Sequence, residues 1–191
     1  MRQIGRSFPI FLVSAVLVLL VAAQEARAQA CDAVAPDNCV VETFNSATTG
    51  NKGATWTSPN GFVFTVIQGG GTHLLDDFTN LGHGLLLGCD STLMEIPDKP
   101  REYVTLVFKG FTEEPPTTLN LIAVDSNGNI VDATTKNNPD LSEGAEVIHL
   151  GTGEAPIAEV YMHQVLASEC EENCNESVIS EVRACNRQVN N

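Results

Sequence analysis

The sequence has 191 residues, 43% of them hydrophobic, and carries a net charge of −14. Because nucleic-acid phosphates bind to a basic surface, so acidic a chain argues against a nucleic-acid partner and against an anionic membrane surface. The excess of carboxylates has two interpretations: a solvated surface that keeps an exported protein dispersed, or clusters that bind a hard cation such as calcium.

The first 30 residues predict a secretory signal peptide. Two arginines precede an apolar run over residues 8–23, and small residues at Ala28 and Ala30 offer A-x-A cleavage sites. The apolar run is shorter than the ~20 residues of a membrane-spanning helix, so no membrane insertion is expected after cleavage. Cys31 follows Ala30 directly, which leaves lipidation of this cysteine as the alternative.

The mature chain is expected to form one domain over residues 31–191, secreted to the extracellular space or the periplasm. Loss of residues 1–30 removes three arginines and one glutamate, which changes the net charge from −14 to −16. A chain of about 160 residues buries roughly two-thirds of its unfolded surface, which is enough for one ordinary core.

All six cysteines lie after residue 30, and an even number in an exported chain predicts disulfides. Local pairs are favoured because short loops close easily. We therefore expect Cys31 to pair with Cys39. The two cysteines of the acidic loop 170–174 are expected to pair locally or with Cys185. Cys89 follows an apolar run and is expected to stay free.

Short apolar runs separated by turn signals predict strands along most of the mature chain. They are expected at residues 39–44, 54–57, 62–68, 84–88, 91–96, 103–109, 118–124, from 129 onward, 145–150, 157–163 and 178–185. Loops are expected at residues 45–53, 72–82, 135–144 and 167–176. About ten or eleven short strands, with few helix signals, predict an all-β antiparallel β-sandwich of the jelly-roll type.

The stretch 102–132 is the expected centre of this sandwich. Both faces of residues 103–109 are apolar, which is typical of a central strand covered on both sides or of a strand at a crowded corner. The run 125–129, Asp-Ser-Asn-Gly-Asn, superficially resembles a calcium-binding loop. Its glycine stands fourth rather than sixth, so a hairpin turn is favoured over a metal loop.

The order of strands and turns over residues 39–185 resembles the galactose-binding-like jelly rolls of bacterial carbohydrate-binding modules. The matching features are VETF, the LGHGLLLG and STLMEI pair, EYVTLVF, LNLIAVDSNGNIV and the closing VISEVRA. Many members hold a structural calcium where the first and last strands meet. By position, the resemblance implies Glu42 and Glu181 as ligands, with Asp90 or the Asp76–Asp77 pair as further oxygen donors. The alternative is that these are ordinary edge charges.

Carbohydrate binding uses aromatic faces together with polar side chains. Trp56, the only tryptophan, lies in a polar hairpin with Asn60, and Asp76 and Asp77 follow in an acidic loop. These four residues are the candidate ligand-binding set. A place at the rim of the core is the alternative for Trp56, and an aromatic content of 6% argues against a polysaccharide face. Tyr161 and Tyr103 are expected in the core.

No catalytic site is assigned. A G-x-S-x-G nucleophile motif does not occur in the sequence. His149 and His163 are expected on adjacent strands, where they would face each other, but the spacing of the four histidines does not require a metal.

These observations predict a secreted, non-catalytic module that binds carbohydrate or another extracellular polymer. Two alternatives remain. One is a structural subunit of an extracellular polymer or surface layer, which would self-assemble by strand addition through a free arm at residues 31–40. The other is a hydrolase whose site the spacing does not reveal.

Overall fold

The computed structural model describes residues 38–68, 72–78, 82–87, 91–98, 100–110, 117–137, 146–166 and 177–187. The predicted signal peptide and the acidic loop 167–176 lie outside these ranges, as do Cys31, Cys89 and Asp90. Within the described ranges, no helix has the length and hydropathy needed to cross a membrane.

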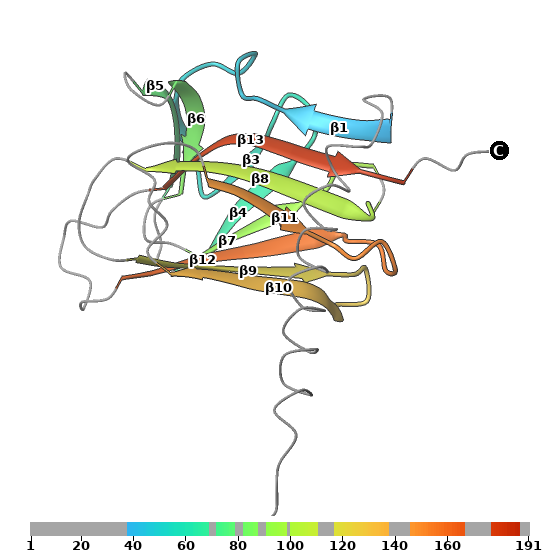
Figure 1. Cartoon of the computed structure of the whole chain (residues 1–191). Coiled ribbons are helices and arrows are strands. Elements are labelled where there is room, and N and C mark those ends of the chain that lie inside the picture. The colour runs from blue at the N-terminus through green and yellow to red at the C-terminus, as the bar shows by residue number, and fades with distance from the viewer. Residues whose placement is uncertain are drawn as a thin grey trace, which may run out of the picture.

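The described residues contain thirteen strands in two antiparallel sheets that form a β-sandwich (Figure 1). The seven-stranded sheet has the order β11-β8-β13-β6-β5-β2, with β1 also paired to β13. Its strands are β1 (Cys39–Glu42), β2 (Gly50–Gly53), β5 (His73–Phe78), β6 (Gly82–Leu86), β8 (Tyr103–Gly110), β11 (Glu146–Leu150) and β13 (Ser177–Cys185). The predicted all-β sandwich is confirmed.

The six-stranded sheet has the order β10-β9-β12-β7-β4-β3. Its strands are β3 (Thr55–Thr57), β4 (Val63–Gln68), β7 (Ser91–Glu95), β9 (Thr117–Val124), β10 (Ile130–Asn137) and β12 (Glu159–Leu166). Figure 1 shows β9, β10 and β12 in one layer and β8, β11 and β13 in the other.

The core lies between the two sheets and follows from the two-residue period of the strands. In β8, Val104, Leu106 and Phe108 point inward and are fully buried. They pack with the inward residues of the other sheet, such as Leu121 and Met94. β8 pairs with β11 on one side and β13 on the other, which confirms the prediction of a central strand.

Both predicted hairpin turns are present. In the turn between β3 and β4, Gly61 donates to the Ser58 carbonyl at 2.9 Å and has φ of +88°, which favours glycine. In the turn between β9 and β10, the Asp125 carboxylate accepts the backbone N–H of Asn127 at 2.8 Å and that of Asn129 at 2.9 Å. The Asn129 side chain donates a further bond at 2.9 Å. This carboxylate therefore serves the turn, which confirms the hairpin interpretation.

Three stretches expected to be irregular or loops contain strand residues. β5 forms within residues 72–82, although its sequence ends in two carboxylates and a phenylalanine. β2 forms within residues 45–53 and pairs with β5. β10 continues to Asn137, because its residues pair with β9 along its length. Backbone pairing to a neighbouring strand outweighs the low strand propensity of these polar sequences.

Two pairs of consecutive strands that were expected to be neighbours belong to different sheets. β6 pairs with β5 and β13, whereas β7 pairs with β4 and β12. β11 pairs with β8, and β12 pairs with β7 and β9. His149 of β11 and His163 of β12 therefore lie on opposite sheets, and the expectation that they face each other is wrong.

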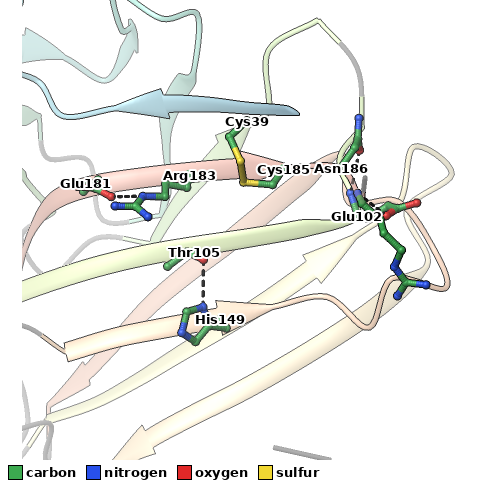
Figure 2. Close-up of a disulfide and its surroundings, with 9 residues drawn as sticks. Cys39, Glu102, Thr105, His149, Glu181, Arg183, Cys185 and Asn186 are labelled. Atoms are coloured by element: carbon green, nitrogen blue, oxygen red, sulfur yellow. Dashed lines mark hydrogen bonds and ion pairs between the residues drawn. A yellow bond between two sulfur atoms is a disulfide. The ribbon is translucent and has the colours of Figure 1, made fainter. Parts of the chain in front are cut away.

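A disulfide joins Cys39 of β1 to Cys185 of β13 (Figure 2). The two cysteines are directly opposite each other in the strand register, with their Cα atoms 4.1 Å apart. The expected pairs of Cys31 with Cys39, and of Cys185 with a cysteine of loop 170–174, are therefore wrong. Long-range strand pairing brings the two thiols together despite a separation of 146 residues. A disulfide is typical of proteins outside the reducing cytoplasm.

Two polar contacts link the sheets where their end strands β10 and β11 approach each other. Lys136 Nζ lies 2.7 Å from Glu146 Oε1. The backbone N–H of Gly151 donates to Asp132 Oδ2 at 2.8 Å. These contacts hold β10 of one sheet against the β11 region of the other.

Candidate functional site

Glu42, the first implied calcium ligand, lies at the end of β1 with its side chain in the interior, where it is fully buried. Its Oε1 accepts the backbone N–H of Phe44 at 2.7 Å, and its Oε2 accepts that of Asn60 at 3.0 Å. Phe44 has a φ of +62°, a left-handed conformation that is uncommon outside glycine. The carboxylate thus fixes the chain leaving β1 and ties it to the turn between β3 and β4.

Glu181, the second implied ligand, lies on the other face of the seven-stranded sheet. Glu42 is opposite Val182, and opposite residues share a face, whereas Glu181 precedes Val182 and points the other way. Glu181 pairs with Arg183 on that face (Figure 2). The described residues contain no group of three or more His, Cys, Asp or Glu side chains that could hold a metal. The structure therefore does not bring Glu42 and Glu181 together.

Trp56 lies on the inward side of β3, opposite Phe64. Its ring stacks on Phe64 with centroids 6.0 Å apart and contacts Phe44 at 6.3 Å. Lys52 Nζ lies 5.4 Å from the centroid of the indole ring. Trp56 is half-buried and packs against the core, the position that the rim-of-core alternative describes.

The other predicted ligand residues are Asn60 and the Asp76–Asp77 pair. The side-chain amide of Asn60 is hydrogen-bonded to β1, because it donates to the Val41 carbonyl at 2.8 Å. Asp76 and Asp77 are exposed on β5 and, as consecutive strand residues, point to opposite faces. The four residues do not converge on one surface, and their role in binding stays a prediction.

Three of the four histidines each contact a hydroxyl on a neighbouring element. His73 Nε2 lies 3.2 Å from Thr92 Oγ1 in the core, and this contact crosses from one sheet to the other. His149 Nδ1 lies 3.0 Å from Thr105 Oγ1 on the outside of the seven-stranded sheet (Figure 2). The third contact, 2.6 Å, joins His163 Nδ1 to the hydroxyl of Ser91.

The Ser91–His163 contact is the arrangement nearest to a catalytic one. Ser91 is buried, which restricts access of a substrate to its hydroxyl. Within the described ranges, no carboxylate is hydrogen-bonded to His163, so a third group that would orient the imidazole is missing there.

The outer face of the six-stranded sheet carries a continuous row of side chains across every strand of that sheet. The strand register places six residues opposite one another, and we call them the central row: Thr55, Thr65, Leu93, Tyr161, Ile122 and Ala133. All six are exposed or half-exposed, whereas the alternate residues, such as Met94 and Val160, are buried. Tyr161 therefore lies on the outer face, and its expected place in the core is wrong.

Polar side chains flank the central row on both sides. On one side, Glu95 and Glu159 are directly opposite each other, and the Tyr161 hydroxyl lies 3.4 Å from Glu159 Oε2. On the other side, His163 is opposite Asn120, with the Ser91 hydroxyl also bound to His163. The face therefore combines an apolar and aromatic strip with hydrogen-bonding groups along both margins.

Sequence reasoning missed this face, although the strands themselves were largely predicted. The signal was the alternation in β12, where Glu159, Tyr161 and His163 share one side and Val160 and Met162 the other. That pattern alone indicates an amphipathic strand with a tyrosine on its polar side.

Comparisons with known proteins give no family for this chain. No family profile matches it, and no curated protein matches it. Among solved structures, the enzymatically active domain of tailspike protein 4 of bacteriophage CBA120 is similar at 15% identity, with a TM-score of 0.35. The alignment covers 72% of this chain and 19% of that one. A likeness at this TM-score carries no argument about function.

Proposed function

We propose that this protein is a secreted, non-catalytic module that binds an extended extracellular polymer, such as a polysaccharide, on the outer face of its six-stranded sheet. The observation that carries the proposal is the central row. Neighbouring strands lie about 4.8 Å apart, so a row across six strands is roughly 24 Å long, enough for several monomers of a chain.

The chemistry of the row suits a carbohydrate. A sugar ring presents an apolar C–H face and a rim of hydroxyls. Tyr161 offers an aromatic surface for the first, with Leu93 and Ile122 beside it. The carboxylates of Glu95 and Glu159 and the amide of Asn120 offer partners for the second. Secretion is supported by the Cys39–Cys185 disulfide.

Neither alternative function has comparable support. The Ser91–His163 pair has a buried hydroxyl. Assembly through a free arm at residues 31–40 is weakened because Cys39 and Val40 already pair with β13, and the disulfide fixes Cys39 there.

Binding to a panel of insoluble and soluble polysaccharides tests the proposal, with Tyr161→Ala compared against Trp56→Ala. Each variant is first shown by circular dichroism to be folded. We expect Tyr161→Ala to weaken binding about tenfold, as loss of an aromatic contact does, and Trp56→Ala to have the smaller effect, because its ring packs against the core. Absence of binding to every polymer, or equal affinity of Tyr161→Ala and wild type, would contradict the proposal.

Structural calcium stays a proposal of its own. Thermal melting with calcium and then with excess chelator tests it, because a ligand that binds only the folded state raises the melting temperature. A rise that chelator reverses and that Glu42→Gln abolishes would support a site at Glu42. Identical melting temperatures with calcium and with chelator would contradict the calcium site.

A further inference from the structure

We infer that the polymer bound on the outer face carries primary amines, as a deacetylated amino-sugar chain does, and that an ammonium group sits between Glu95 and Glu159. The inference rests on the proposed function, because it assigns a ligand chemistry to the same face. It begins from the two carboxylates, which are direct cross-strand partners in the β7–β12 pair.

Two like charges in this position destabilise a sheet. Directly opposite residues have Cβ atoms about 5 Å apart, and like-charged pairs at that separation repel each other. Glu95 is exposed and Glu159 is half-buried, so solvent screens the pair only in part. A cation bound between them would remove the repulsion and gain two favourable contacts.

The sheet itself supplies no such cation. Lys136 is the only lysine or arginine in the six strands of this sheet, and it pairs with Glu146 of the other sheet. No described lysine or arginine forms an ion pair with Glu95 or Glu159. Among the described residues, Glu95 and Glu159 therefore have no ion-pair partner, in a protein whose net charge is already −14.

The surroundings favour an ammonium on a polymer over a free metal ion. Calcium takes about six to eight oxygen ligands, and the described residues around the pair do not form a larger acidic group. Tyr161 hydrogen-bonds to Glu159 and places an aromatic ring beside the pair, which also attracts ammonium groups. The adjoining central row offers an apolar surface to the carbon skeleton of an amine-bearing chain. A bare metal ion makes no apolar contacts and would not bind to this row.

The decisive experiment compares matched oligomers of chitin, which is acetylated, and of chitosan, which carries free amines. Affinity is measured by calorimetry for the wild type, for Glu95→Gln/Glu159→Gln and for Asp76→Asn/Asp77→Asn. The last variant also removes two negative charges, but from an exposed strand of the other sheet. It therefore controls for general attraction of a polycation to an acidic protein.

We expect the wild type to bind chitosan about tenfold more tightly than chitin, a preference typical of charge-assisted contacts. Glu95→Gln/Glu159→Gln should lose that preference and bind the two oligomers equally, whereas Asp76→Asn/Asp77→Asn should keep the tenfold preference. Equal affinities for the two oligomers, or an equal loss in both double variants, would overturn the inference and leave the proposed function standing. Absence of binding to any polysaccharide, in contrast, overturns both.

Discussion

Cys39 and Cys185 are directly opposite each other on β1 and β13, and their disulfide joins the first and last strands of the described fold. The bond closes a loop of 146 residues and lies at a fully buried cysteine, Cys185. A cross-link stabilises a protein mainly by restricting its unfolded chain, and it does so more for longer loops. This disulfide therefore encloses nearly the whole domain.

Replacing both cysteines, as Cys39→Ser/Cys185→Ser, should lower the free energy of unfolding by about 2–5 kcal/mol. Chemical denaturation of the oxidised wild type, the reduced wild type and the variant measures the effect. Because reduction also acts on the other four cysteines, the variant is measured in both redox states, and under reducing conditions it should unfold at nearly the same denaturant concentration as the reduced wild type. A variant as stable as the oxidised protein would show that strand pairing alone holds β1.

Glu42→Gln should destabilise the protein by about 1–3 kcal/mol, the usual cost of leaving a buried hydrogen-bonding group unsatisfied. Both carboxylate oxygens of Glu42 accept backbone N–H groups, and a glutamine amide has only one oxygen to offer. Glu181→Gln is the control, because Glu181 is partly exposed and its ion pair contributes at most about 1 kcal/mol. Equal melting temperatures for the two variants would contradict the assigned role of Glu42.

The stability contributed by Asp125 should depend on pH. The side chain of Asn129, and then the backbone N–H groups of Asn129 and Asn127, lower the pKa of Asp125 below its usual 3.8, although desolvation opposes them. A lowered pKa in the folded state means that the stabilisation is complete above the unfolded pKa. It is lost as the pH falls through the lower folded pKa.

Melting temperatures of wild type and Asp125→Ala, measured from neutral pH down to about pH 2, test this sign. The gap between them should be constant at neutral pH and should shrink only in the acid range. Asp77→Asn, at an exposed strand position, corrects for general loss of charge. A gap that persists unchanged to the lowest pH would mean that the Asp125 carboxylate charge does not stabilise the turn.

Glu159→Gln should raise the stability of the free protein by a few tenths to about 1 kcal/mol, because it removes a like charge opposite Glu95. The gain should shrink at high salt, since ions screen charges near the surface. Denaturation at low and at high ionic strength measures both effects. Loss of stability on this substitution would show that the two carboxylates do not repel each other.

The turns could be predicted from the sequence, because the conformation of a tight turn is determined by its own few residues. The Ser-Pro-Asn-Gly and Asp-Ser-Asn-Gly-Asn turns carry their own hydrogen bonds, so both hairpins could be read from the sequence. The assignment of strands to sheets could not. Alternation in β6 and β7 shows which side of each strand is apolar, but both sheets of a sandwich bury one side, so the pattern is the same for either sheet.

The candidate site was harder to predict for a related reason. It depends on residues from six strands that only the register brings into line, and Glu95 and Glu159 are 64 positions apart in the chain. Trp56 was predicted to bind ligand because it is an isolated aromatic residue in a polar hairpin. Trp56 is directly opposite Phe64 across the hairpin, so both side chains lie on the inward side and their rings stack.

The contact between Lys136 and Glu146 bears on how the protein behaves at high concentration. β10 and β11 are the end strands of the two described sheets on this side, and end strands are where foreign chains add and aggregation begins. The ion pair places one charge of each sign on these two margins. Charged side chains on an edge strand oppose the addition of a foreign strand, so this pair protects both margins from misassembly.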